Sequence, residues 1–243
     1  MTGAQRICWY GQNSRQEGKV NDKKICFIMC VNDKLYEEEC IRYIQKLNVP
    51  EGYEVEQLSI WDAPSMAAGY NEGMRQSDAK YKVYLHQDVF VVYQNFIYEF
   101  LKIFSQDSKI GMVGMVGSPV LPMEGVMWAG ARIGALFTSN VKEAGPALIG
   151  EVRSPYEQVE AVDGLLIATQ EDLPWRGDIF TGWDFYDISQ SMEYRKAGYK
   201  VVVPQMEYPW CLHDDGFVNL ETYFKWRDVF LKEYGDMLHE TDK

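Results

Sequence analysis

Continuous apolar runs alternate with amphipathic stretches along the first half of the chain. Residues 24–30, KICFIMC, are apolar after their first position. Such a run is typical of a strand that is covered on both faces of a parallel sheet. Asn32 and Asp33 follow and can cap a helix, and apolar residues then recur at helical spacing over 35–47. The pattern therefore predicts a buried strand followed by a helix.

The same alternation continues to about residue 116. We expect a strand over 53–60, a helix from Pro64 to Asp78, a third strand in the stretch 80–93, a helix over 94–105 and a strand over 109–116. Strands that alternate with helices in this order favour an α/β fold with a Rossmann-like, mostly parallel central sheet flanked by helices.

The second half of the chain is less regular. Residues 117–150 are rich in glycine and proline and show no clear period. We expect a strand over 159–169, an amphipathic helix over 183–197 and a final strand over 199–203. No repeat or linker interrupts the chain, so we expect one domain over 23–218. An irregular lead-in over 1–22 precedes it, and a C-terminal helical segment over 219–243 packs on the same domain.

Charge and composition exclude several classes of partner. The chain has 24 Lys and Arg against 36 Asp and Glu, a formal charge of −12. Such a surface repels nucleic acid and anionic lipid, and an anionic ligand would need local cations or a bound metal. No apolar run approaches a membrane span, and five cysteines without a CxxC fit a reducing compartment. We expect a cytoplasmic protein without a transmembrane segment, with peripheral attachment at the inner membrane face as an alternative.

Common nucleotide-binding signatures are missing after the first predicted strand. The sequence there is CVNDKLYEEE, which contains neither GxGxxG nor GxxxxGK[ST]. Dinucleotide and P-loop binding at this turn are therefore not expected. The loop also lacks the Gly, Arg and Lys residues that a nucleotidyltransferase would use to hold a triphosphate.

His86 and Asp88 stand two residues apart at the carboxyl end of the third predicted strand. Strand alternation would point both side chains the same way, and ligands in open α/β sheets bind at this end of the strands. An Asp with a second donor can hold Mg²⁺ or Mn²⁺ against a diphosphate. A polar strand end before a turn explains the same residues equally well, so this stretch alone leaves both interpretations open.

Three polar residues of the predicted helix 183–197 share one face. Asp184, Asp187 and Ser191 lie at i, i+3 and i+7, opposite an apolar stripe. An acid in the first turn can stabilise the helix dipole, or it can act as a general base. His213, in CLHDDG, follows the last predicted strand, and a lone histidine is more often structural than a ligand.

Five motifs in this order resemble family 2 glycosyltransferases of the GT-A fold, in a prokaryotic branch with HQD where most members have DxD. They are ICFIMCVND, MAAGYNEGMRQSDAKYKVYLHQDV, VDGLLIA, YDISQSMEYRKAGYKV and a late histidine. The resemblance spans about residues 24–216. It implies a single domain of the nucleotide-diphospho-sugar transferase type.

The resemblance also implies roles for individual residues. Asp187 corresponds to the inverting catalytic base, and Asp88 with His213 would bind a divalent metal, Mn²⁺ or Mg²⁺. The positions implied on the donor side are Val31, Asn32, Asp62, Asn71 and His86. Those implied on the acceptor side are Asp163, Gly164, Trp183 and Asp184.

The implied activity is transfer of a sugar from a nucleotide-diphosphate donor, most often a UDP-sugar, to a hydroxyl of a saccharide or lipid-linked acceptor. The chain departs from the family pattern at His86, where Asp is usual, and at Tyr186, where Glu is usual. These departures leave open a catalytically silent sugar-nucleotide or glycan-binding domain, or a structural partner protein. The sequence indicates neither the sugar, the acceptor nor the oligomeric state.

Overall fold

The computed structural model describes residues 5–8, 19–216 and 220–238. Eight strands form the central sheet: β1 (Gln5–Cys8), β2 (Asn21–Val31), β3 (Glu54–Trp61), β4 (Ala79–His86), β6 (Ile110–Gly114), β10 (Tyr156–Val159), β12 (Leu166–Thr169) and β13 (Lys200–Pro204). Their order is β1-β3-β2-β4-β12-β6-β13-β10. The pairs among β1, β3, β2 and β4 are parallel, as is β6 with β13, whereas β12 is antiparallel to both neighbours. The mostly parallel α/β sheet expected from the sequence is confirmed.

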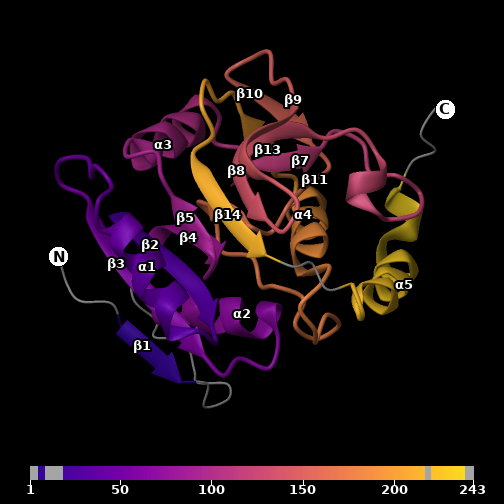
Figure 1. Ribbon diagram of the computed structural model, residues 1–243, viewed down its shortest axis with the longest axis horizontal. Coiled ribbons are helices and arrows are strands. Elements are labelled where there is room, and N and C mark those ends of the chain that lie inside the picture. The colour runs from indigo at the N-terminus through magenta and orange to yellow at the C-terminus, as the bar shows by residue number, and fades with distance from the viewer. Residues whose placement is uncertain (1–4, 9–18, 217–219, 239–243) are drawn as a thin grey trace.

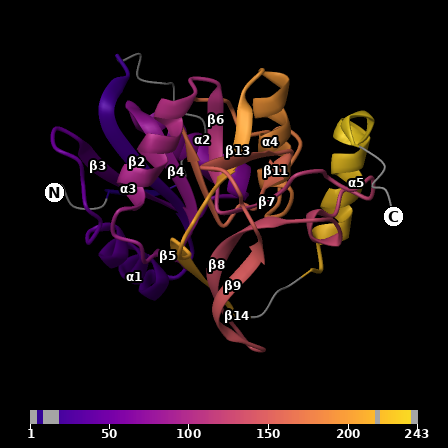
Figure 2. The ribbon, with the colours of Figure 1, turned by 90° about the horizontal axis from the view of Figure 1, so that it is seen from above.

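A second, smaller sheet lies beside the first. Its strands are β5 (Val89–Val91), β7 (Val116–Ser118), β8 (Ile133–Asn140), β9 (Ala144–Gly150), β11 (Ala161–Val162) and β14 (Cys211–Gly216). The order is β11-β7-β8-β14-β5, and β9 pairs with β8. Figures 1 and 2 show β8, β9 and β14 together on one side of the molecule.

Helices cover both faces of the central sheet. These are α1 (Lys34–Ile44), α2 (Met66–Gln76), α3 (Phe96–Gln106) and α4 (Tyr186–Lys196). The helix α5 (Tyr223–Tyr234) and the short 3₁₀ turn η1 (Met127–Ala129) pack in a separate apolar cluster, and the 3₁₀ turn η2 (Gly235–Met237) follows α5. Alternate residues of β2 enter two different cores: Phe27 packs with residues of α1 and α3, and Ile28 with residues of α2 and α4. The continuous apolar run at 24–30 therefore reflects burial on both sides.

Helix α1 begins where the sequence predicts, because the Asp33 carboxylate accepts the N–H groups of Leu35 and Tyr36. Helix α4 begins later than predicted. Phe185 has a left-handed backbone with φ of 62°, so Asp184 lies outside the helix and does not share a face with Asp187. Ser191 is fully buried rather than part of a polar face. Figures 1 and 2 show α5 beside α4 at the edge of the molecule.

Several elements differ from the sequence predictions because their pairing partners are remote. The lead-in expected to be irregular contains β1, which pairs with β3. The strand expected over 159–169 is three strands, since β10 pairs with β13, β11 with β7, and β12 inserts between β4 and β6. Residues 117–150 contain the β8–β9 hairpin. His213 lies within β14 rather than after the last strand.

Among the residues that the structure describes, the longest helices are too short and too polar to cross a membrane.

Candidate active site

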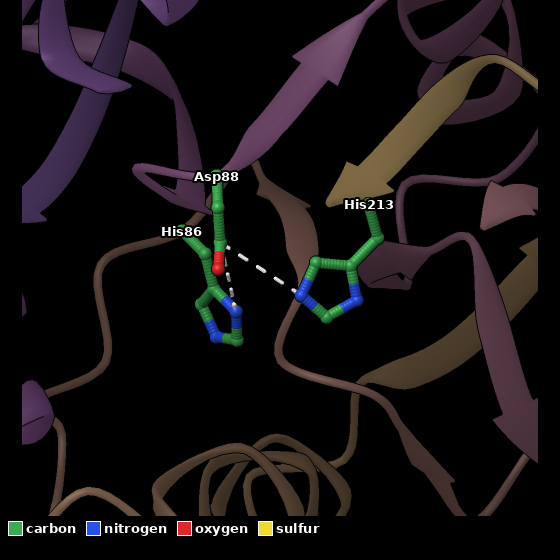
Figure 3. A group of neighbouring side chains, drawn as sticks. All are labelled: His86, Asp88 and His213. Carbon is green, nitrogen blue, oxygen red and sulfur yellow. Dashed lines mark ion pairs between the residues drawn. The ribbon is translucent and has the colours of Figure 1, made fainter. Parts of the chain in front are cut away.

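Three ligand-type side chains converge at the carboxyl end of β4. His86 is the last residue of β4, Asp88 lies in the turn before β5, and His213 comes from β14, which pairs antiparallel with β5. Asp88 Oδ1 is 3.9 Å from His86 Nδ1 and 3.7 Å from His213 Nε2. Figure 3 shows all three side chains pointing toward one another, and their ligand atoms lie within 4.8 Å of each other. The β5–β14 pairing brings residues 125 positions apart in the chain to one point.

The electrostatics of this triad fit a divalent cation. Asp88 Oδ1 is buried and has no hydrogen-bond partner among the residues that the structure describes, and such an atom is costly unless something satisfies it. Burial raises the pKa of Asp88, and the neighbouring His213 opposes that rise. Burial, and then the neighbouring His213, lowers the pKa of His86 to about 3, so this imidazole is neutral with a free lone pair. One carboxylate and two imidazoles are ligands that Mn²⁺ and related metals accept.

A cavity of about 230 Å³ adjoins the triad. Its lining joins the loop after β2, the turn after β3 and the turn after β4, which are the carboxyl ends of three neighbouring parallel strands. The lining residues include Val31, Asn32, Asp62, His86, Gln87, Asp88 and Trp183. Four of the five residues predicted on the donor side therefore lie in one cavity. Trp183, expected on the acceptor side, lines the same cavity.

The cavity has two features of a constrained binding site. Asp62 has φ of 58°, a conformation that non-glycine residues seldom adopt and that is often kept at functional sites. Gln87 holds two loops together: its Oε1 accepts the N–H groups of Asn32 and Asp33 at 3.0 Å, and its Nε2 donates to Asn32 Oδ1 at 2.6 Å. The sequence analysis missed Gln87, although its place between His86 and Asp88 was a usable signal.

Asp187 lies in the first turn of α4. Its carboxylate has a pKa suited to accepting a proton. Its Oδ2 accepts the Gly164 N–H at 2.8 Å. Burial, and then the negative charge of Asp163, raises the pKa of Asp187 to about 7. The charge of Asp163 also acts on His86 and raises its pKa, so Asp163 lies near the triad. A carboxylate with a pKa near neutrality is what a general base requires.

Six of the predicted residues do not line this cavity: Asn71, Asp163, Gly164, Asp184, Asp187 and His213. Two of them, Asn71 and Asp184, bond other parts of the chain. Both ends of the Asn71 amide bond the backbone of Trp175, with Nδ2 donating at 2.7 Å and Oδ1 accepting at 2.9 Å. Asn71 therefore fixes a loop instead of lining the donor cavity. The Asp184 carboxylate accepts from Thr222 Oγ1 at 2.6 Å, which joins the segment before α4 to the residue that precedes α5. A larger hollow of about 650 Å³ contains none of the predicted site residues.

The strand order and the mostly parallel pairing of the central sheet are those of the GT-A fold of glycosyltransferases. The cavity and the carboxylate–histidine triad lie at the carboxyl ends of its parallel strands. The chain belongs to the glycosyltransferase-like family, whose sequence profile matches residues 26–234. The expected membership of a family 2 type of glycosyltransferase is thereby confirmed. No curated protein matches the chain in sequence.

Solved structures share the fold at low identity. One is the mannosyltransferase PcManGT from Pyrobaculum calidifontis in complex with GDP-Man and Mn²⁺, with 14% identity, a TM-score of 0.54, and coverage of 91% of this chain and 68% of that one. Another is S. aureus TarS, with 10% identity, a TM-score of 0.57, and coverage of 90% of this chain and 40% of that one. A third is S. aureus TarS 1-349 in complex with UDP, with 9% identity, a TM-score of 0.51, and coverage of 86% of this chain and 65% of that one. At these identities the likeness shows the fold alone.

Proposed function

We propose that the protein transfers a sugar from a nucleotide-diphosphate donor to an acceptor hydroxyl, with a divalent metal and with inversion at the anomeric carbon. A UDP-sugar is the first candidate donor, and the acceptor is a saccharide or a lipid-linked saccharide. The observation that carries the proposal is the convergence of His86, Asp88 and His213 beside the cavity. Asp187 bonds the same loop as His86, since Gly164 donates to Asp187 and Leu165 accepts from the His86 N–H.

The cavity residues suit the nucleotide half of the donor. The loop with Val31 and Asn32 and the turn with Asp62 offer amide and carboxylate groups that can bond a base and a ribose. The indole of Trp183 is half exposed at the cavity and can cover the sugar or the base. Gln87 keeps the two walls of the cavity at a fixed separation.

The triad residues suit the diphosphate. His86 Nδ1, Asp88 Oδ1 and His213 Nε2 would hold the cation, and their unsatisfied geometry supports this assignment. A bound divalent cation supplies positive charge that stabilises the diphosphate as it leaves. The same cation explains how a chain with a formal charge of −12 binds an anionic donor.

Asp187 supplies the base. The acceptor hydroxyl gives its proton to the Asp187 carboxylate as its oxygen attacks the anomeric carbon, and the bond to the nucleoside diphosphate breaks on the opposite face. The Gly164 N–H holds the carboxylate in place through Oδ2. The raised pKa of Asp187 supports a catalytic role over a silent binding domain.

A screen of UDP-, GDP- and dTDP-sugars for Mn²⁺-dependent hydrolysis tests donor and class together. We expect hydrolysis of at least one donor, with Asp187→Asn abolishing turnover while nucleotide binding, followed by thermal shift, persists. Metal-dependent stabilisation by a nucleotide without hydrolysis or transfer would instead identify a binding domain. No response to any nucleotide would reject the proposal.

A further inference from the structure

The two departures from the family pattern contact each other. His86 from β4 and Tyr186 from α4 are 100 positions apart, and His86 Nε2 lies within hydrogen-bond distance of the Tyr186 hydroxyl. The Tyr186 ring is buried and packs on Tyr70 with 5.8 Å between ring centroids and on Trp175 with 6.1 Å. This packing fixes the hydroxyl in position beside the imidazole.

Gly164 makes the contact between His86 and Tyr186 possible. A Cβ added at Gly164 would lie 2.1 Å from the Tyr186 hydroxyl oxygen and 2.9 Å from Asp187 Cβ. No side chain fits at that separation, so the loop between β11 and β12 admits the tyrosine only with glycine at this position. The same loop bonds His86 directly, since the His86 N–H donates to the Leu165 carbonyl at 3.1 Å. The backbone and the ring of His86 are thus both held.

We infer that Tyr186 is a positioning residue that accepts the Nε2–H of His86 and so directs the Nδ1 lone pair toward Asp88. The inference rests on the metal site of the proposed function. A neutral imidazole carries one N–H, and the nitrogen that binds a metal must be the other one. Nδ1 is the nitrogen that faces Asp88, so the proton belongs on Nε2, where the tyrosine oxygen accepts it. Histidine ligands commonly donate their second N–H to a carboxylate, a backbone carbonyl or a water, and the tyrosine oxygen can accept it in the same way.

This arrangement gives a physical reason for the paired departure. The family pattern places Asp and Glu at these positions, and here a neutral His–Tyr pair occupies them. Asp163 and Asp187 already place negative charge nearby. A neutral pair bound to each other keeps one metal-ligating nitrogen and adds no further charge to a buried region.

Mn²⁺ titration by calorimetry, without nucleotide sugar, tests the inference on the full chain. Tyr186→Phe removes only the hydroxyl, and we expect Mn²⁺ binding to weaken about tenfold. Tyr70→Phe is the matched control, because Tyr70 is buried in the same cluster and no described residue hydrogen-bonds its hydroxyl. It should leave Mn²⁺ affinity unchanged. In a His86→Ala background, Tyr186→Phe should have no further effect, because the hydroxyl acts through the imidazole.

Equal Mn²⁺ affinity of Tyr186→Phe and wild type, or an equal loss in the His86→Ala background, would overturn the inference. Long-range ¹H–¹⁵N spectra of the metal-free protein give a second readout, and they are simple because the chain has three histidines. We expect the Nε2–H tautomer of His86 in wild type and its loss in Tyr186→Phe, whereas an Nδ1–H tautomer in wild type would reject the assignment. If wild type binds no Mn²⁺, the metal dependence of the proposed function fails, and the tautomer alone decides the role of Tyr186.

Discussion

The ionisation of Asp187 should control the pH dependence of transfer. Its pKa is raised to about 7 by burial and by Asp163, and the base is active only when ionised. About a tenth of the molecules carry the ionised form at pH 6 and about nine tenths at pH 8. The value of kcat/KM should therefore rise about tenfold between these pH values, with an inflection near 7.

The same shift has a consequence for stability, with the opposite sign. The pKa of Asp187 in the folded state lies above its unfolded value near 3.8. The folded protein is therefore more stable with Asp187 protonated than with Asp187 ionised. That contribution is complete below the unfolded pKa and is lost as pH rises through about 7. Ionisation costs at most about 4 kcal/mol by pH 8. Asp187→Asn should abolish transfer and raise the melting temperature more at pH 8 than at pH 5.

The assay measures kcat/KM for the acceptor from about pH 5.5 to about pH 8.5 at saturating Mn²⁺, so that metal binding does not set the profile. Asp163→Asn provides the control. Removing the charge of Asp163 leaves burial as the main cause of the shift, and the inflection should move to lower pH. The position of the inflection, and not the absolute rate, is compared.

A flat profile between pH 6 and pH 8 would refute the assignment of Asp187 as the base. So would an inflection that Asp163→Asn moves upward, since removing a neighbouring negative charge can only favour the carboxylate. Near wild-type turnover in Asp187→Asn would reject the role outright.

Three further changes test other parts of the site. Asp88→Asn should eliminate the rise in melting temperature that Mn²⁺ and UDP together give wild type, because it removes the anionic ligand atom of the triad; an undiminished rise would place the metal elsewhere. Gly164→Ala should lower the free energy of unfolding by about 1–3 kcal/mol, since its Cβ would overlap Tyr186. Urea unfolding measures this loss, and Gly235→Ala, which has open space around it, should show no such loss. Gln87→Leu should weaken donor binding roughly fivefold, or about 1 kcal/mol, by releasing the loop after β2; unchanged donor affinity in calorimetry would show that the clamp is dispensable.

Local sequence patterns contain much of the parallel part of the fold. The apolar run at 24–30 indicated a strand buried on both faces, and Asp33 identified the start of α1 through its capping side chain. The spacing of apolar residues and the capping side chains of helices depend only on residues close together in the sequence. They can therefore be recognised without knowing which strands or helices pack against the element. The position of His86 and Asp88 at the end of a strand followed from the same pattern.

The second sheet and the completed site depended on the tertiary structure. Strand β12 inserts antiparallel between β4 and β6, and β14 pairs with β5, although nothing near these segments in sequence specifies those partners. Asn71 illustrates the same limit, because its place in a motif indicated donor binding while its amide bonds the backbone of Trp175.

The sequence by itself determined the α/β class, the family and the residue types available for metal and proton chemistry. Only the tertiary structure decided that His213 joins His86 and Asp88, and that Tyr186 contacts His86 through the space left by Gly164. The physical reason is that the order of the strands and the paths of the loops set the distances between residues 100 or more positions apart in the chain. Those distances, and the burial that accompanies them, give each side chain its pKa and its partner.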